Sequence, residues 1–366
     1  MIPNFYLHPE TTEYSFGARH PLKPERLHRT MALLHRLAEV DVLVPAPATP
    51  AEVALVHSPA YVEAIAEVEE LLKTGARHER LGELSAEFGL YGDNPPFPAI
   101  YRSSLAYVGA TLRAAEAVRD GAQRAFGIGG GLHHAMRARA SGFCIFNDPA
   151  LAVAVLRQRF ARVAYIDIDV HHGDGVQQLW LNDPAVLTAS IHEDPRTLWP
   201  GTGYVRETGT AFTSVNVPIP ANATGDAWRL GFQTILDALK KFQPEAIVLQ
   251  LGTDAHYLDP LAHLRADARD WLWAVEKIHE LGLPTVAVGG GGYNLTTVPR
   301  MWTAAILTLS GLPVPEQIPE DLRDRLQVTW MTDQDRPEEP SSGYDQAAAT
   351  VKVLERDLLP FIPGPA

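Results

Sequence analysis

The chain has 366 residues, of which 46% are hydrophobic, and this is enough apolar sequence for one large core. Its formal net charge of −13 argues against binding to nucleic acid or to an anionic membrane, and no apolar run is long enough to span a bilayer. A single cysteine, Cys144, excludes an internal disulfide framework, and with no signal-peptide pattern at the start of the sequence we expect a cytoplasmic protein.

Five apolar runs have the composition of buried parallel strands. In chain order they are residues 124–128, 163–166, 186–191, 246–251 and 285–288. Apolar residues at helical spacing occupy residues 148–160, 226–242 and 267–281. This alternation predicts an α/β fold in which a single, mostly parallel sheet is covered by helices on both faces.

The sequence shows no internal repeat and no Gly/Ser-rich linker. We therefore expect one domain over residues 1–366, with a core at about residues 15–312. Residues 313–366 are expected to form a helical and proline-rich extension, in which 336–340 and the prolines from 360 onward make surface turns and a tail. The sequence does not indicate an oligomeric state.

Polar side chains follow each predicted strand. They lie in residues 129–134, 167–175, 190–192, 250–254 and 289–293. Because ligands bind at the carboxyl ends of the strands in open α/β sheets, we expect these five segments to meet at one edge of the sheet.

Residues 167–175 place three aspartates and two histidines directly after a buried strand, and burying them is costly without a cation. Asp169 and His171 alternate along an extended backbone, so both side chains can share one face. With Asp254 as a third ligand, two oxygens and one nitrogen leave coordination positions open, as a catalytic zinc or ferrous iron site requires. The alternatives are a polar turn at 167–175 and a helix cap at Asp254.

His133 and His134 form a tandem pair on a glycine-rich loop. Asp167 and Asp174 are not needed as metal ligands, so each can accept a ring N–H from one histidine. Beside a metal-bound water, such imidazoles would supply a general base and a general acid. Tyr293 closes a run of four glycines and either packs over a turn or donates to a substrate carbonyl as it becomes an oxyanion.

These motifs, in this order, resemble the metal-dependent histone deacetylase superfamily, and they look most similar to the bacterial acetoin-utilisation deacetylases, which are class I-like. The similarity runs from residue 20 to residue 303. Its most specific motifs are residues 132–135, 140–144, 146–148, 167–175, 200–203 and 289–293.

The resemblance implies an arginase–deacetylase fold and hydrolysis of the acetyl amide of ε-acetyl-lysine in proteins by a metal-bound water. It implies that the ligands of Zn²⁺, with Fe²⁺ as the alternative, are Asp169, His171 and Asp254. It implies that the catalytic residues are His133, His134, Asp167, Asp174 and Tyr293. Among these, His134 would be the general base and acid, and Tyr293 would polarise the carbonyl.

The resemblance also implies a substrate tunnel and a second cation site. The substrate-binding residues would be Arg26, Asp93, Gly142, Phe143, Leu198 and Trp199, with Asp93 at the rim and Arg26 in a cavity that releases acetate. A structural K⁺ or Na⁺ would be bound, mostly through backbone oxygens, by Asp167, Asp169, His171, Ser190 and Ile191. Trp199 stands where a phenylalanine is usual, which predicts a narrower or differently shaped tunnel mouth. Residues 193–196 are individual to this chain, which leaves its peptide preference open.

Three alternatives to protein deacetylation remain at this point. The first is hydrolysis of acetylpolyamines or other small acylated amines, although no insertion that would constrict the tunnel is evident. The second is an arginase-like ureohydrolase with two manganese ions, which would need paired aspartates where residues 252–256 offer Asp254 alone. The third is a non-catalytic binder of acylated lysine, which we would expect to lack His134, Tyr293 or a metal ligand.

Overall fold

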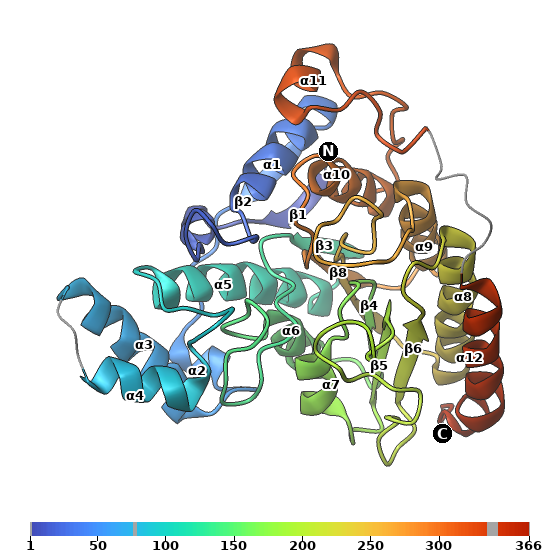
Figure 1. Cartoon of the computed structure of the whole chain (residues 1–366), viewed down its shortest axis with the longest axis horizontal. Helices are drawn as coiled ribbons and strands as arrows, with labels where there is room; N and C mark the ends of the chain where they lie inside the picture. Colours follow the sequence, from blue (N-terminus) through green and yellow to red (C-terminus); the bar gives the residue numbers. More distant parts are fainter. Residues whose placement is uncertain (1, 76–78, 335–342, 366) are drawn as a thin grey trace.

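The computed structural model describes residues 2–75, 79–334 and 343–365. In these residues a single sheet of eight strands has the order β2-β1-β3-β8-β7-β4-β5-β6, and every pair of neighbours is parallel (Figure 1). The strands are β1 (Ile2–Tyr6), β2 (Val40–Leu43), β3 (Arg124–Gly127), β4 (Val163–Asp167), β5 (Val186–Glu193), β6 (Ser214–Ile219), β7 (Ala246–Gln250) and β8 (Thr285–Val288). The predicted parallel sheet is confirmed.

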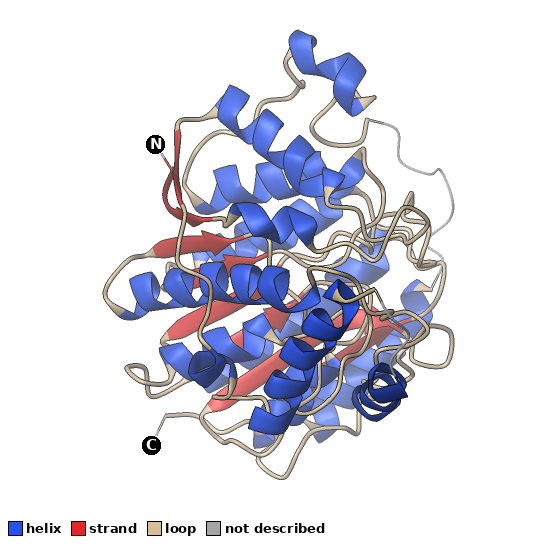
Figure 2. Ribbon diagram, turned by 90° about the vertical axis from the view of Figure 1, so that its left-hand side faces the viewer, coloured by secondary structure: helices blue, strands red, loops and turns tan. Residues whose placement is uncertain are grey.

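Helices cover both faces of the sheet, as Figure 2 shows and as the sequence predicted. In the described residues the α-helices are α1 (Glu25–Leu37), α2 (Pro50–Val53), α3 (Pro59–Lys73), α4 (Glu79–Phe88), α5 (Ile100–Arg119), α6 (Asp148–Leu156), α7 (Asp174–Trp180), α8 (Gly225–Phe242), α9 (Ala268–Glu280), α10 (Thr297–Leu309), α11 (Glu320–Leu326) and α12 (Tyr344–Asp357). Two short 3₁₀ helices lie at Pro9–Glu13 and Leu359–Phe361.

The central strands are buried on both faces. In β4, Val163 and Tyr165 pack into a core with α5 and α6, whereas Ala164 and Ile166 pack into a core with α8, α9 and α10. Successive side chains of a strand point to opposite faces, so a strand covered on both sides must be apolar throughout. This is why the central strands appear in the sequence as uninterrupted apolar runs.

Three strands were missed by the sequence analysis, and they lie toward the two edges of the sheet. β2 is short and only partly buried, and β1 contains a proline and an asparagine. β6 contains Asn216 and Pro218. β6 is an edge strand, where proline is tolerated because one side makes no ladder hydrogen bonds. β1 lies one strand in from the other edge, and its pairing register with β2 shifts between Ile2 and Phe5, the stretch that contains its proline.

The strand order explains why distant segments meet. The neighbours β3, β8, β7 and β4 are followed by the four segments that carry His133, Tyr293, Asp254 and Asp169. The carboxyl ends of these four parallel strands lie at one edge of the sheet, which is the usual ligand site in such folds.

The C-terminal segment packs on the same body. α12 lies along α8, and Leu354 and Leu358 join the core that α8 and α9 share (Figure 1). The turns expected at 336–340 lie outside the described residues. Within the part of the chain that the structure describes, no helix is both long and apolar enough to cross a membrane.

Candidate active site

Three buried side chains meet at the carboxyl ends of β4 and β7. Possible ligand atoms of Asp169, His171 and Asp254 all lie within 4.8 Å of one another. Nδ1 of His171 is 3.2 Å from Oδ1 of Asp169 and 3.1 Å from Oδ2 of Asp254. The structure therefore brings together the three side chains expected to bind the metal.

The chemistry of this group fits a divalent cation. The two carboxylates are 1% and 0% exposed, and one imidazole lies between them, so burial leaves excess negative charge. Oδ2 of Asp169 accepts hydrogen bonds from the Gly291 N–H at 2.7 Å and from the Gln250 amide at 2.8 Å. These neutral donors orient the carboxylate but do not balance its charge. Two oxygens and one nitrogen suit zinc or ferrous iron.

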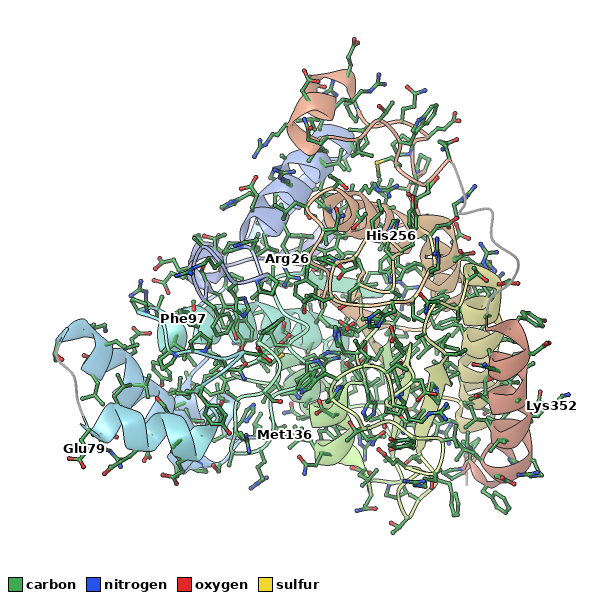
Figure 3. All side chains as sticks on the ribbon, in the orientation of Figure 1. Arg26, Glu79, Phe97, Met136, His256 and Lys352 are labelled. Carbon is green, nitrogen blue, oxygen red and sulfur yellow. The ribbon has the colours of Figure 1, made fainter. Side chains whose placement is uncertain are left out.

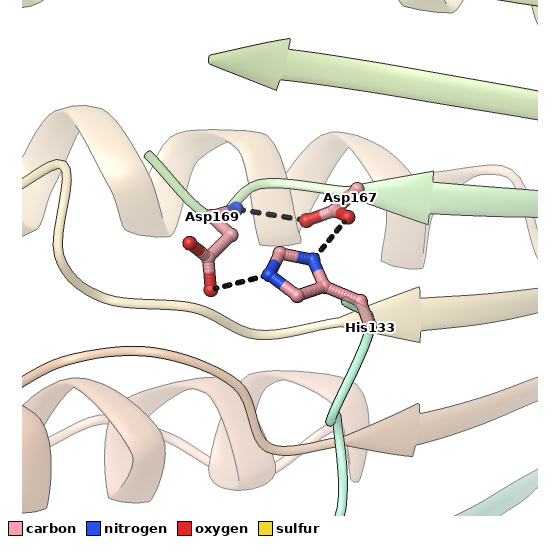
Figure 4. A group of neighbouring side chains, drawn as sticks. All are labelled: His133, Asp167 and Asp169. Atoms are coloured by element: carbon pink, nitrogen blue, oxygen red, sulfur yellow. Dashed lines mark hydrogen bonds and ion pairs between the residues drawn. The ribbon is translucent and has the colours of Figure 1, made fainter. Parts of the chain in front are cut away.

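The tandem histidines each donate to their own carboxylate. Nδ1 of His133 lies 2.7 Å from Oδ2 of Asp167 (Figure 4), and Nδ1 of His134 lies 2.7 Å from Oδ1 of Asp174. The Tyr165 hydroxyl also donates to Oδ2 of Asp167, at 2.6 Å. With Asp167 and Asp174 ionised, Nδ1 is the donor in each pair, and Nε2 of His134 is left as the atom that can accept a proton. Nε2 of His133 instead faces Oδ2 of Asp169 at 3.8 Å.

The two imidazoles differ in charge. Burial opposes a charge on His133, but the carboxylates of Asp167 and Asp169 outweigh it and raise its pKa to about 9. Burial, together with the neighbouring His133 and His171, lowers the pKa of His134 well below its usual value. In the protein chain at neutral pH, His134 is therefore the imidazole able to accept a proton.

A cavity of about 300 Å³ ends at His134, His171 and Tyr293. The walls of the cavity are Gly142, Phe143, Leu198 and Trp199, and the other lining residues are His20, Pro21, Asp93 and Leu261. Five of the six residues expected to bind substrate therefore line this cavity. The sixth, Arg26, lines a smaller cavity of about 20 Å³ behind the histidines, together with Leu22 and Cys144.

Tyr293 is oriented by a residue that the sequence analysis missed. Its backbone N–H donates to Oδ2 of Asp259 at 2.8 Å, and its ring packs edge-on against Phe143 with centroids 5.7 Å apart. Burial raises the pKa of Tyr293 well above its usual value, so the phenol stays protonated and can donate a hydrogen bond. Asp259 follows Asp254 by five residues on the same loop, and this proximity is the one sequence signal that could have identified it.

The tunnel wall at Gly142 and Phe143 has an unusual backbone. Their φ angles are +51° and +66°, a region that residues with side chains rarely adopt. The Phe143 N–H donates to the Asn94 side chain at 2.7 Å, and its carbonyl accepts from the Tyr14 hydroxyl at 2.6 Å. These hydrogen bonds hold the strained backbone conformation of Phe143, whose ring forms part of the cavity wall.

A buried clamp of four residues, His57, Thr111, Asn147 and Asp148, fixes the tandem-histidine loop. The carboxylate of Asp148 accepts from the N–H groups of Gly131 and Leu132 at 2.8 and 2.9 Å, and from the hydroxyl of Thr111. The Asn147 amide donates to the carbonyls of His133 and Ala135 at 3.1 and 2.9 Å. The Asn147 N–H donates to Nε2 of His57 at 2.8 Å. The sequence named residues 146–148 as a motif but did not indicate this role.

Arg26, labelled in Figure 3, is the first buried residue of α1. Its Nη1 donates to the carbonyl of Gly290 at 2.7 Å and to that of Gly292 at 3.2 Å, and its guanidinium lies 5.0 Å over the Trp302 ring. It therefore braces the four-glycine turn that precedes Tyr293.

The residues expected to bind a monovalent cation lie on the adjoining strands β4 and β5 and on the loop that follows β4. Asp167 ends β4 and pairs in register with Ser190 on β5, which Ile191 follows. Asp169 and His171 come directly after β4, so the five predicted residues are neighbours. A cation site there stays a prediction.

Comparison with known proteins identifies the family. The histone deacetylase domain matches residues 20–309. The acetoin utilization protein AcuC of Bacillus subtilis is 38% identical over 337 residues, which cover 87% of this chain and 84% of that protein. Histone deacetylase clr6 of Schizosaccharomyces pombe is 32% identical over 324 residues, covering 86% and 78%. AcuC of Staphylococcus xylosus is 35% identical over 325 residues, covering 84% and 82%.

The relatives are acetoin utilization proteins and histone deacetylases, the two groups that the sequence motifs resembled, so the predicted family is confirmed. The parallel α/β sheet is consistent with the arginase–deacetylase fold expected for this family. The site contains a His/Asp group able to bind the metal on which this family depends. The chain belongs to the histone deacetylase family and is a deacetylase hydrolase.

Proposed function

We propose that this enzyme hydrolyses the acetyl amide of ε-acetyl-lysine in proteins. The observation that carries the proposal is the cavity that runs between Phe143 and Trp199 and ends at His134 and Tyr293. Its aromatic walls suit the aliphatic part of a lysine side chain, and its polar end suits the amide. Asp93 at the rim would accept N–H groups of the substrate backbone.

The proposed ligands of a zinc ion, or alternatively of ferrous iron, are Asp169, His171 and Asp254. When bound, the ion would polarise the amide carbonyl and acidify water. Every other step of the proposed reaction depends on side chains of the protein.

His134 is proposed as the general base. It is neutral, and Asp174 accepts its Nδ1–H, so Nε2 can take the proton of the attacking water. The Tyr293 hydroxyl donates a hydrogen bond to the carbonyl oxygen as that atom becomes an oxyanion. His134, having gained the proton, then gives it to the departing amine nitrogen. His133 keeps its own proton and places a positive charge beside the developing oxyanion.

Further roles follow from the same proposal. The small cavity beside Arg26 would release acetate, and the ends of β4 and β5 would hold a structural K⁺ or Na⁺. The whole chain is proposed to form one catalytic domain, because α12 shares the core of α8. A free, buried Cys144 accords with a cytoplasmic location.

The test is acetate release from an acetyl-lysine peptide and from an acetylated polyamine, measured side by side with zinc-loaded and iron-loaded protein. We expect the peptide to be preferred. Preference for the polyamine would keep the chemistry and replace the substrate. Release from neither, by protein shown to contain metal, would contradict the proposed function.

A further inference from the structure

A second groove adjoins the mouth of the active-site cavity. It has a volume of about 420 Å³ and shares Asp93, Gly142 and Trp199 with that cavity. Its lining includes Arg139 and also Met136, three residues earlier on the same loop, which Figure 3 labels. A substrate chain whose lysine entered the cavity would therefore extend across this groove.

Arg139 is fixed in the groove by several contacts. Its Nη2 donates to the Tyr91 hydroxyl at 2.6 Å, and its guanidinium lies 5.8 Å from the centre of the Tyr91 ring. Its stem lies on the backbone of Gly89, where a Cβ atom would come within 2.8 Å of the Arg139 Cγ. Its backbone closes a tight hairpin with Met136. A guanidinium held in this way loses little entropy when it binds a ligand.

Across residues 2–75, 79–334 and 343–365, no carboxylate forms an ion pair with Arg139, whereas the exposed Arg196 is paired with Asp194 at 2.5 Å. The guanidinium of Arg139 has five N–H donors, and the Tyr91 hydroxyl accepts from one of them, so the others can bind an acceptor of the substrate.

We propose that Arg139 binds a carboxylate of the substrate chain close to the acyl-lysine. The carboxylate belongs either to an acidic side chain or to a free C-terminus, because both present the two oxygens that a guanidinium binds best. Asp93, in the same groove, stays available for backbone N–H groups. The inference rests on the proposed function, which places acyl-lysine in the adjoining cavity.

The experiment compares amidated acetyl-lysine peptides that carry Asp or Glu, or else Asn or Gln, one or two positions either side of the acetyl-lysine. A further pair ends in acetyl-lysine as a free acid or as an amide. The kcat/KM ratio of acid to neutral peptide is measured for the wild type, Arg139→Gln and Arg139→Glu. The matched control is Arg137→Gln, an exposed arginine two residues earlier that does not line the groove.

We expect the wild type and Arg137→Gln to favour an acidic peptide by roughly threefold to tenfold, and the preference to weaken with added salt. Arg139→Gln should remove the preference, and Arg139→Glu should reverse it. Preference in the internal series assigns the site to an acidic side chain, and preference in the terminal pair alone assigns it to a free C-terminus. Equal turnover of acid and neutral peptides by the wild type would overturn the inference and leave the proposed function standing.

Peptide binding provides a readout that does not need turnover. Fluorescence anisotropy of labelled peptides gives Kd for the same acid and neutral pairs. If no peptide is hydrolysed, the proposed function fails. An acid preference in Kd that disappears in Arg139→Gln would still support the carboxylate site, and equal Kd values would overturn it.

Discussion

His133 is hydrogen-bonded to Asp167, and His134 to Asp174, at the same distance of 2.7 Å, yet the pKa of His133 is raised and that of His134 is lowered. Nε2 of His133 also lies 3.8 Å from Asp169, so two carboxylates favour its charge, and its pKa rises to about 9. Burial dominates for His134, and the charge of His133 beside it lowers its pKa further. One histidine is thereby kept as a cation and the other as a base.

Asp174→Asn should lower kcat by about 10²-fold to 10⁴-fold with little change in KM. The carboxylate sets the tautomer of His134 and stabilises the imidazolium that forms during the reaction, and it does not line the cavity. Steady-state kinetics with an acetyl-lysine peptide measure the effect. Asp237→Asn, on the exposed side of α8, is the matched control and should behave as the wild type. Near-native kcat in Asp174→Asn would exclude His134 as the base.

Tyr293→Phe should keep the metal and the fold but reduce turnover by about 10²-fold to 10³-fold, since it removes one donor to the oxyanion. The ring is partly buried and packs edge-on against Phe143, so loss of the hydroxyl alone leaves this packing intact. Metal content, thermal unfolding and kcat should be measured together. Tyr101→Phe, on α5, controls for the loss of a phenol elsewhere. Turnover like that of the wild type would remove Tyr293 from the mechanism.

Gly142→Ala should cost about 10²-fold in kcat, because a displaced catalytic group loses its alignment with the substrate. A Cβ atom at this position would collide with the rings of His134 and Trp199, and the φ of +51° disfavours a side chain as well. The change should be visible in peptide kinetics, while Gly82→Ala, where a Cβ atom meets nothing within 4 Å, should leave kcat unchanged. Equal kcat for the two variants would show that the tunnel wall can shift freely.

The sequence predicted the central strands and the residues at their ends because both follow from local pattern. A strand buried on two faces must be apolar throughout, and polar residues directly after it lie at the carboxyl edge. Edge strands such as Ser214–Ile219 lack that pattern. One side of an edge strand has no neighbouring strand, so its backbone N–H and C=O groups can bond to solvent or be covered by a helix, and polar residues and proline are tolerated there.

Contacts between loops could not be predicted in the same way. Asp259 reaches the backbone of Tyr293 across 34 positions, and Asn147 reaches His57 across 90. Such bonds depend on how each loop turns after its strand, and loop geometry is not encoded in apolar periodicity. Likewise, the guanidinium of Arg139 is held by a hydrogen bond to the hydroxyl of Tyr91, 48 positions away.

His57 should make stability fall as the solution is acidified. It is fully buried, and burial lowers its pKa from 6.5 to about 4. Between these values the unfolded chain binds the proton and the folded chain does not, so the free energy of unfolding decreases as pH falls through this window. The contribution lost between pH 7 and pH 5 is about 2 kcal/mol.

Urea unfolding of the wild type and of His57→Gln at both pH values measures this contribution, because the other titrating groups are common to the two proteins. The wild type should lose about 2 kcal/mol more than the variant on acidification. Parallel losses would show that His57 takes up its proton at the same pH in the folded protein as in the unfolded chain, so that burial does not lower its pKa.

A zinc titration of metal-stripped protein, with acetate release from an acetyl-lysine peptide as the readout, tests whether one metal ion at this site supports catalysis. Asp169, His171 and Asp254 form one site in this account, so activity should be absent without metal, rise in proportion to added zinc and saturate at one equivalent per chain. Asp254→Asn should neither retain the ion nor release acetate. Acetate release by metal-free protein, or saturation only at two equivalents, would contradict a single catalytic metal site formed by these three ligands.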